Sequence, residues 1–476
     1  MDFLDKLESH ADRTLVMGDD GRSWTYAELL TLSAALSRAG VARQLVFCLC
    51  ANDPGSLVGY LALLHAGAVP VLLNANLQAN QLTALADAYK PAFFWQSSHT
   101  QQQNIAIDNI ANFDRYALRA LPAGGGYPVH PDLALLLSTS GSTGSPKLVR
   151  QSRRNLGSNA QAIAQYLSLT PEDRPITTLP LSYTYGLSVI HSHVLLGCTI
   201  ALTARGFFDK GFWSFLTSAE ATSFGGVPYH YDMLKKLRFF NMHLPSLRTL
   251  TQAGGRMSPA LALEMAQGCA TRGIRYFAMY GQAEATARMS YLPPEKAIAK
   301  AGSIGQAIPG GTFWLETDDG QRIDAPGQAG QLVFQGPNVT MGYAHTCADL
   351  ARGDDNHGVL HTGDLARRDA DGDYHIVGRT KRFLKLFGHR INLQDVDDAL
   401  HQDGLDAASG GEDDHLKLYI ANPDPTQASA LKQRVADMLK VHPSAVSVMG
   451  VKALPRNEAG KVSFAALGDV PTKALA

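Results

Sequence analysis

The apolar positions near the N-terminus follow first helical and then extended spacing. From Thr25 they recur at helical spacing through Leu36 and stop at Gly40, which predicts an amphipathic helix. The run 44–50 is almost wholly apolar and predicts a buried strand. The stretch 58–73 predicts a buried helix, a turn and a second buried strand. Strands that alternate with helices favour parallel sheets covered by helices, so we predict an α/β fold.

The pattern changes near Gly330. Short runs of extended residues, at 331–334 and 374–377, are accompanied by Asp–Gly turns at Asp319 and Asp371. These features predict short antiparallel strands, which would form a small barrel-like subdomain after the parallel-rich sheets.

The pattern restarts after Arg382 as a compact α+β arrangement. It predicts a strand at 416–420, a helix from about 427 to 439 and a strand at 445–449. About 95 residues suffice for a small domain of their own. The two domains that we predict are 1–380 and 381–476.

Composition narrows the class of protein. The chain has 476 residues, of which 45% are hydrophobic and 18% are charged, which excludes a disordered protein. Because 42 basic residues balance 43 acidic ones, the chain lacks the electrostatic footprint of a nucleic-acid or anionic-membrane binder.

The sequence also favours a cytoplasmic location without membrane insertion. The first ten residues are acidic and amphipathic, unlike a signal peptide, and the apolar stretch 58–73 is short and interrupted. The five cysteines are scattered, and Cys48 and Cys50 have the wrong spacing for a metal or redox pair. This cysteine usage is typical of a reducing compartment.

The densest chemical signal is the run 135–147, LLLSTSGSTGSPK, in which a buried strand leads into small residues and Lys147. Glycines let backbone N–H groups turn toward a phosphate, hydroxyls add donors, and the lysine adds charge. On its own the run is equally compatible with a flexible Ser/Gly turn. A Walker A loop is excluded, because Pro146 precedes the lysine and no Ser or Thr follows it.

Four other segments carry residues suited to chemistry, although each alone has a structural interpretation as core, turn cap or solvated charge. They are Met279-Tyr-Gly-Gln-Ala-Glu284, Leu360-His-Thr-Gly-Asp364, Gly378-Arg-Thr-Lys-Arg382 with Lys385 and Gly388-His-Arg390, and Leu454-Pro-Arg-Asn-Glu-Ala-Gly-Lys461. We expect Asp364 to end a strand. In this order and spacing, the five segments resemble the adenylate-forming superfamily of acyl- and aryl-CoA ligases, stand-alone adenylation domains and luciferases. The resemblance extends from Thr25 to Lys461.

The resemblance implies a reaction in two halves that uses ATP and Mg²⁺. A carboxylate attacks the α-phosphate of ATP, which gives an acyl-adenylate and pyrophosphate, and a thiol then takes the acyl group as a thioester. It also implies that the C-terminal domain rotates between the halves about Lys381. This rotation would withdraw Lys461 and bring Gly388 to the site, where a glycine leaves room for the thiol arm.

The resemblance further assigns a role to individual residues. The β- and γ-phosphates would be held by Thr139, Ser140, Gly141, Ser142, Thr143, Gly144 and Lys147, with Arg390 approaching the phosphates. Mg²⁺ would be held by Glu284 and Thr143. The adenine and acyl-carboxylate region would be lined by Gly254, Gly255, Tyr280, Gly281 and Gln282, and the ribose would be held by Asp364 and Arg379. Lys461 would stabilise the charge that accumulates between the substrate carboxylate and the α-phosphate.

Three departures from the family pattern keep a second class of function open. Ala283 stands where the family usually has Thr, which removes a hydroxyl contact to the α-phosphate that Gln282 could replace. Tyr183 takes the place of an aromatic gate histidine, and Asn457 the place of a Thr. A nucleotide-binding protein with weakened catalysis is therefore an alternative, although a mere binder has no need for Glu284 and Lys461 together.

The acyl substrate and the thiol acceptor are predicted more coarsely. Amino-acid-activating members place an aspartate after the position of Pro180, whereas 182–185 contain none. Because a buried ammonium without a carboxylate is costly, we expect an acid without an α-amino group. The acceptor would be CoA or the phosphopantetheine of a separate carrier protein, since no carrier site appears in the tail. The pocket for an aryl or medium acyl group would be lined by Tyr183, Tyr185, Phe224, Val227 and Tyr229.

Overall fold

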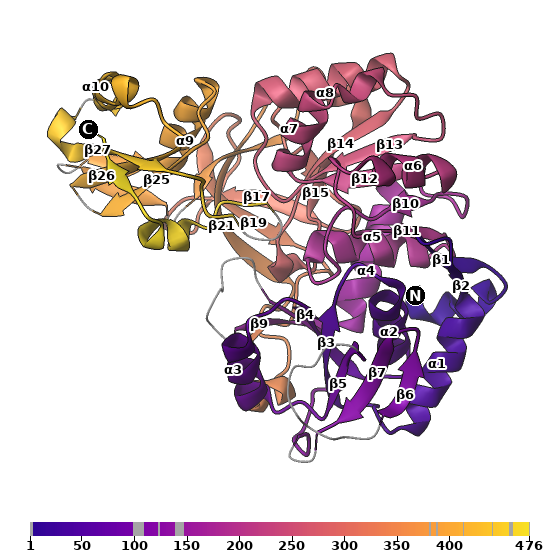
Figure 1. Cartoon of the computed structure of the whole chain (residues 1–476). Coiled ribbons are helices and arrows are strands. Elements are labelled where there is room, and N and C mark those ends of the chain that lie inside the picture. Colours follow the sequence, from indigo (N-terminus) through magenta and orange to yellow (C-terminus); the bar gives the residue numbers. More distant parts are fainter. Residues whose placement is uncertain are drawn as a thin grey trace.

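The computed structural model describes residues 3–98, 109–121, 124–138, 147–379, 382–386, 389–412, 414–439, 441–456 and 460–475. Large mixed sheets layered with helices make up the main body, which confirms the predicted α/β fold (Figure 1). A smaller unit that contains the C-terminus lies to one side of this body, at the upper left of Figure 1.

The first sheet is built from the early part of the chain, in the order β20-β9-β8-β4-β3-β5-β7-β6. Its strands β3, β4, β5 and β8 run parallel, as the alternation of strands and helices predicts. The strands are β3 (Leu45–Cys50), β4 (Val69–Asn74), β5 (Phe93–Ser97), β6 (Asn109–Phe113), β7 (Tyr116–Ala120), β8 (Leu133–Ser138), β9 (Leu148–Ser152) and β20 (Tyr343–Ala344).

The second sheet has the order β16-β15-β14-β13-β12-β10-β11-β1-β2, with β10 to β14 parallel. Its strands are β1 (Thr14–Gly18), β2 (Ser23–Thr25), β10 (Pro175–Ile176), β11 (Ile200–Leu202), β12 (Ser223–Gly226), β13 (Thr249–Gln252), β14 (Arg275–Tyr280), β15 (Ser290–Leu292) and β16 (Gln306–Ala307).

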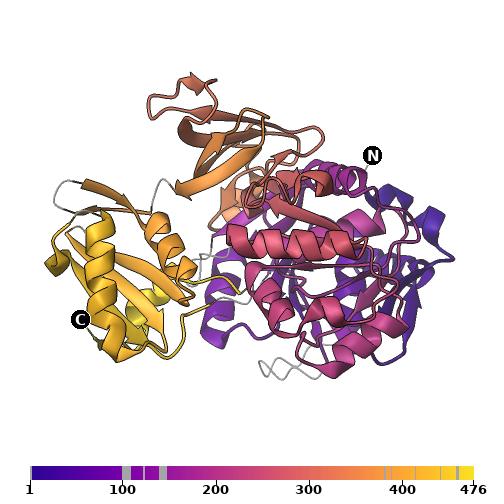
Figure 2. The same cartoon turned by 90° about the horizontal axis from the view of Figure 1, so that it is seen from above.

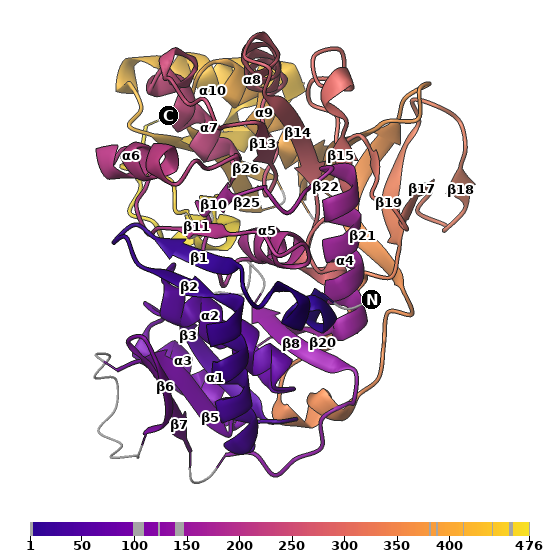
Figure 3. The same cartoon turned by 90° about the vertical axis from the view of Figure 1, so that its right-hand side faces the viewer.

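The helices cover these sheets, and α4 and α5 pack against each other between the two sheets (Figure 3). The helix α1 follows its N-cap, Thr25, whose hydroxyl and the Glu28 side chain form a reciprocal capping box, so the predicted start is confirmed. The helices are α1 (Tyr26–Arg38), α2 (Pro54–His65), α3 (Ala79–Tyr89), α4 (Arg153–Tyr166), α5 (Thr184–Val194), α6 (Lys210–Ser218), α7 (Pro228–Lys236), α8 (Pro259–Thr271), α9 (Leu393–Gln402) and α10 (Ala428–Leu439).

A third, antiparallel sheet follows in the order β18-β17-β19-β21-β22. It stands beside the gap between the main body and the C-terminal unit in Figure 2. Its described strands form an open antiparallel sheet, in agreement with the short antiparallel strands that the sequence predicts here. The strands are β17 (Thr312–Glu316), β18 (Arg322–Ile323), β19 (Ala329–Gln335), β21 (Val359–Arg368) and β22 (Tyr374–Arg379).

The expectation that Asp364 ends a strand is wrong. β21 continues past it to Arg368, which pairs with Tyr374 on β22. Gly363 has a φ of +72°, and the register of pairing shifts between Leu365 and Ala366. Such an irregularity bends a strand and redirects side chains without ending the strand.

The C-terminal unit buries apolar residues of its own. Residues from β26, α10 and β27, among them Leu418, Val435 and Val448, form one cluster with Leu384 and Leu400. The predicted strand, helix and strand are confirmed as β26, α10 and β27, with bounds that differ by one or two residues. The strands of this unit are β23 (Phe383–Leu386), β24 (His389–Asn392), β25 (Ala407–Glu412), β26 (His415–Ala421), β27 (Val446–Val451) and β28 (Lys473–Ala474).

Two further observations bear on the sequence analysis. Among the described residues, no helix combines the length and the apolar character needed to cross a membrane. Cys48 and Cys50 lie buried on β3, which confirms that this part of the chain is a buried strand.

Candidate active site

A buried carboxylate, that of Asp364, lies at the centre of the candidate site. The residue is 2% exposed and lies directly opposite Arg379 on the neighbouring strand. Arg379 donates from Nε to Oδ1 at 2.8 Å, while the Tyr280 hydroxyl and the Gln282 amide donate to Oδ2 at 2.5 and 2.9 Å. Because a buried polar group is tolerated only when it is hydrogen-bonded, these three donors satisfy the buried carboxylate and hold it in place.

The segment after β14 supplies two of those donors. Burial, and after it the charge of Asp364, raises the pKa of Tyr280 well above its usual range, so its hydroxyl stays protonated and donates. Gln282 also donates to the carbonyl of Thr362 at 3.0 Å, which ties this segment to β21. A Cβ on Gly281 would overlap the carbonyl oxygen of Ala287, so only glycine fits between these two donors.

A second carboxylate, Glu284, follows in a short 3-10 helix, Ala283–Ala285. Its main-chain carbonyl accepts from the Thr340 amide at 3.0 Å, and its Oε1 accepts from the Tyr343 hydroxyl at 2.6 Å. The Nζ of Lys147 lies 3.4 Å from the centroid of the Tyr343 ring. Lys147, Tyr343 and Glu284 therefore lie together, although they come from distant parts of the sequence.

Lys461 reaches the same site from the C-terminal unit. Its side chain is half-buried, and its Nζ lies 5.7 Å from the centroid of the Tyr183 ring. Burial, and after it the positive charge of Arg379, lowers the pKa of Lys461 to about 8, whereas the charges of Asp364 and Glu284 act in the opposite direction. The structure thus brings together Lys461, Arg379 and both carboxylates.

The two glycines after β13 border this cluster. Gly254 has a φ of +83°, and a Cβ there would overlap the Tyr183 hydroxyl and lie 3.0 Å from Val227. A Cβ on Gly460, just before the lysine, would lie 3.3 Å from Val227 and 3.5 Å from Tyr229. The lysine segment therefore lies against the residues that precede and begin α7. Gly255, which follows Gly254, lies beside Pro228, the first residue of α7.

The five residues predicted to line the acyl group do not all lie together. Tyr185 is buried next to Tyr183, with 6.3 Å between ring centroids, and its hydroxyl lies 2.8 Å from Thr251 Oγ1. Phe224, in contrast, packs against Phe207 at 5.5 Å between centroids, in a separate aromatic core. Because side chains alternate along a strand, Phe224 lies on the other face of β12 from Gly225, which borders the Tyr185 hydroxyl. We therefore remove Phe224 from the predicted lining.

Some predicted positions lie outside the described residues. They are Thr139, Ser140, Gly141, Ser142, Thr143, Gly144, Lys381, Gly388 and Asn457. Arg390 is described through its backbone alone, which pairs with that of Lys385 in the β23–β24 hairpin.

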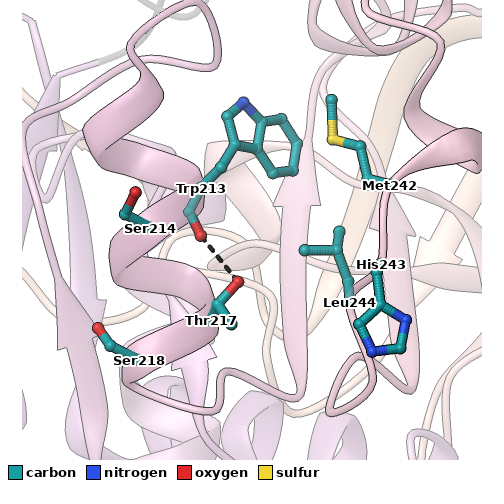
Figure 4. A pocket seen from close by; sticks show the side chains of 7 residues that line it. All are labelled: Trp213, Ser214, Thr217, Ser218, Met242, His243 and Leu244. Atoms are coloured by element: carbon teal, nitrogen blue, oxygen red, sulfur yellow. Dashed lines mark hydrogen bonds between the residues drawn. The ribbon is translucent and has the colours of Figure 1, made fainter.

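A separate pocket lies on the surface between α6 and the segment 242–244 (Figure 4). Its volume is about 500 Å³, and Trp213 and Met242 face it from its two sides. Thr217 is committed to its own helix, since its hydroxyl donates to the carbonyl of Trp213 at 3.0 Å. The pocket contains none of the predicted site residues. Its lining consists of Trp213, Ser214, Thr217, Ser218, Met242, His243 and Leu244.

Comparison with known proteins identifies the family. Residues 3–344 match the family of AMP-binding enzymes. The chain belongs to this family. The resemblance to the adenylate-forming superfamily, drawn from the sequence motifs, is thereby confirmed.

Relatives in this family carry the names of CoA ligases. Feruloyl-CoA synthase of an Amycolatopsis species is 31% identical over 423 residues, which cover 85% of this chain and 82% of the relative. 2-Succinylbenzoate–CoA ligase of Oceanobacillus iheyensis is 25% identical over 470 residues, which cover 95% of each chain. The chain spans about half the length of two other relatives, a probable CoA ligase of Humulus lupulus and oxalate–CoA ligase of Arabidopsis thaliana.

The overall fold also matches solved structures. O-succinylbenzoate coenzyme A synthetase from Bacillus subtilis, in complex with AMP, superposes with a TM-score of 0.80 at 23% sequence identity. The match covers 99% of this chain and 98% of that one, so the fold is shared over nearly the whole length.

Proposed function

We propose that this chain activates a carboxylic acid with ATP as an acyl-adenylate and transfers the acyl group to the thiol of CoA. One observation carries the proposal. Lys461, from the C-terminal unit, shares one site with Asp364, Arg379 and Glu284, and an AMP-forming ligase needs these charges together during the first half-reaction. A protein that only binds nucleotide has no use for the lysine at this position.

In the first half-reaction, Asp364 would accept hydrogen bonds from the ribose hydroxyls. Its present donors leave room for this, because the Arg379 side chain is 60% exposed and can turn toward the nucleotide. Tyr280 and Gly281 would border the adenine. Lys461 would lie between the substrate carboxylate and the α-phosphate, where a fixed cation stabilises the negative charge that develops on attack.

Glu284 suits a magnesium ion. Among the described residues, no group of three or more His, Cys, Asp or Glu side chains could hold a metal. Mg²⁺ needs no such group, since it is commonly bound through one or two carboxylates, substrate phosphates and water. The bound ion would neutralise phosphate charge, and Glu284 would hold it, with Thr143 as the second predicted ligand. A solved structure of this fold contains both ATP and a magnesium ion.

In the second half-reaction, the C-terminal domain 381–476 would rotate about Lys381 against the domain 1–380. The separate apolar core of residues 384–448 supports rotation as a rigid unit. Rotation would carry Lys461 away from the acyl-adenylate and bring Gly388 toward it. Because glycine carries no Cβ, its position would then leave room for the pantetheine arm of CoA.

We further propose an acid with an aromatic or medium-sized acyl group and no α-amino group. Tyr183, Tyr185, Val227 and Tyr229 lie near the lysine and offer apolar and aromatic surface. Among residues 182–185 there is no carboxylate to pair with an ammonium group. Feruloyl and succinylbenzoate, named for two of the relatives, are both aromatic acids. A cytoplasmic location agrees with the described cysteines, which are free thiols.

ATP–pyrophosphate exchange over a panel of aryl, fatty, hydroxy and amino acids tests this proposal. We expect exchange with an aryl or medium-chain acid and a thioester when CoA is added. A thioester with a carrier protein, and none with CoA, would instead establish a carrier-loading adenylation enzyme. Binding of ATP without exchange for any acid would support the non-catalytic alternative and refute the ligase.

A further inference from the structure

One aromatic side chain of the site, Tyr343, contacts both a cation and an anion. Its hydroxyl donates to Glu284 Oε1 at 2.6 Å, and its ring carries the Lys147 ammonium, whose Nζ lies 3.4 Å from the ring centroid. Among the described residues, no ion pair joins Lys147 to Glu284, and Oε2 of Glu284 accepts no hydrogen bond. The phenol thus contacts both charged groups, which form no direct pair with each other in this part of the chain.

The backbone holds Tyr343 beside this lysine. Tyr343 pairs with Val149 and Ala344 with Leu148, so the strand pair β9–β20 starts at the residue that follows Lys147. Arg150, fully buried, donates from Nε to the carbonyl of Tyr343 at 3.1 Å. The position of the phenol is therefore set by the sheet and does not depend on a surface loop.

The next peptide is anchored as well. The Tyr89 hydroxyl donates to the carbonyl of Ala344 at 2.7 Å. Arg150 also donates to the carbonyl of Met341 at 2.6 Å and pairs with Asp355 at the same distance. Main-chain groups on both sides of Tyr343 thus have buried partners, which favours a fixed orientation of its ring.

This arrangement matters because the two charged groups have different targets. A lysine ammonium and a carboxylate in one site attract each other, and a direct pair would neutralise both. An aromatic face attracts the ammonium more weakly than a carboxylate does, and a phenol hydroxyl orients one carboxylate oxygen while the other stays available. The Lys147 ammonium can then move from the ring to a phosphate, and Oε2 of Glu284 can bind a cation.

We propose that Tyr343 is a positioning residue that keeps Lys147 for the phosphates and Glu284 for the magnesium ion, an inference that rests on the proposed function. Its hydroxyl orients the Glu284 carboxylate, and its ring holds the Lys147 ammonium. Replacement by Phe removes the first contact and keeps the second, whereas replacement by Leu removes both.

Equilibrium binding of ATP without any acid tests this inference. Titration calorimetry would be run with excess Mg²⁺ and again with EDTA, on the wild-type chain and on Tyr343→Phe, Tyr343→Leu and Tyr26→Phe. Tyr26→Phe is a matched control, since it removes a buried tyrosine hydroxyl that donates to the carbonyl of Cys198 at 2.8 Å and takes no part in the contacts of Tyr343. We expect Tyr343→Phe to weaken ATP binding about tenfold with Mg²⁺, as for the loss of one hydrogen bond to a charged group, and not with EDTA.

The other variants and the kinetics complete the test. Tyr343→Leu should weaken ATP binding in both conditions, because Lys147 loses the aromatic ring that it contacts and can pair directly with Glu284. The Mg²⁺ concentration that half-saturates ATP–pyrophosphate exchange should rise in Tyr343→Phe and not in Tyr26→Phe. Equal Mg²⁺ dependence in Tyr343→Phe and wild type, or equal losses in Tyr343→Phe and Tyr26→Phe, would overturn the inference. A wild-type chain that binds no ATP would refute the proposed function itself, and the inference with it.

Discussion

Arg256 forms an ion pair with Asp398, which joins the large body of the molecule to the C-terminal unit. The arginine follows Gly254 and Gly255 at the border of the candidate site, and the aspartate lies on α9. Gln394, one turn earlier on α9, donates to the other oxygen of Asp398 at 3.1 Å. The pair is made while Lys461 is in the site, so it belongs to the arrangement that we propose for the first half-reaction.

Removal of this pair should therefore slow adenylation selectively. Exposed ion pairs contribute up to about 1 kcal/mol, so Arg256→Ala or Asp398→Asn should slow acyl-adenylate formation by about two- to fivefold. Thioester formation from supplied acyl-adenylate should be unchanged or faster, since its arrangement no longer competes with the pair. Single-turnover measurements of the two half-reactions check this. The variant Lys235→Ala breaks a similar exposed pair, with Glu264, inside the large body and should affect neither half.

The position of Lys461 leads to a prediction about the lysine itself. Lys461→Ala should reduce adenylation by roughly 10²–10³-fold, the effect typical of removing one preorganised group that stabilises a transition-state charge. The same variant should still form thioester from supplied acyl-adenylate, because the proposed rotation withdraws the lysine in that half-reaction. Rates of pyrophosphate release and of thioester formation distinguish the two halves. Equal losses in both would contradict the assigned role.

The lowered pKa of Lys461 predicts a pH dependence. In the proposed reaction the lysine acts as a cation, and burial lowers its pKa from the usual 10.5 to about 8, so the active form should be lost as the pH rises through about 8. The value of kcat/KM for ATP in adenylation, which reports the free enzyme, should fall above that pH. The fall in kcat should come at higher pH, because bound phosphate favours the charged lysine. Residual activity of Lys461→Arg should lack this fall, since a guanidinium stays protonated.

The sequence predicted those parts of the fold that depend on local pattern. The helix after Thr25 and the strand predicted at 44–50 followed from the spacing of apolar residues, a signal that acts within a few positions. The expected end of a strand at Asp364 was wrong because a bulge continued the pairing. Such an irregularity is set by the neighbouring strands and leaves little trace in the local pattern.

The candidate site could be predicted only as far as family motifs extend. These motifs named Asp364, Arg379, Glu284 and Lys461, which the structure brings together. Tyr343 was missed, because it lies 59 residues from Glu284 and only the pairing of β20 with β9 brings it to the site. Phe224 was misplaced for a related reason, since its face of β12 depends on the register of that strand, which the sequence did not reveal.

Arg456 holds the segment that carries the lysine. Its Nη1 donates to the carbonyl of Gly460 at 3.0 Å, directly before Lys461, and its Nη2 pairs with Asp406 at 2.6 Å. Its guanidinium also lies 5.8 Å from the centroid of the Tyr229 ring, within the range of a cation–π contact. The arginine therefore fixes the peptide before the lysine and places it against α7.

Loss of these contacts should reduce adenylation more than stability. Arg456→Ala should slow acyl-adenylate formation by about three- to tenfold, since a hydrogen bond and a cation–π contact each contribute about 1 kcal/mol or less at a partly exposed site. Thioester formation from supplied acyl-adenylate should remain normal. Arg434→Ala breaks another ion pair of the C-terminal unit, with Asp403, and serves as the control. If Arg434→Ala slowed adenylation as much as Arg456→Ala, the effect would reflect general destabilisation of the unit, and a comparison of their thermal unfolding midpoints would reveal this.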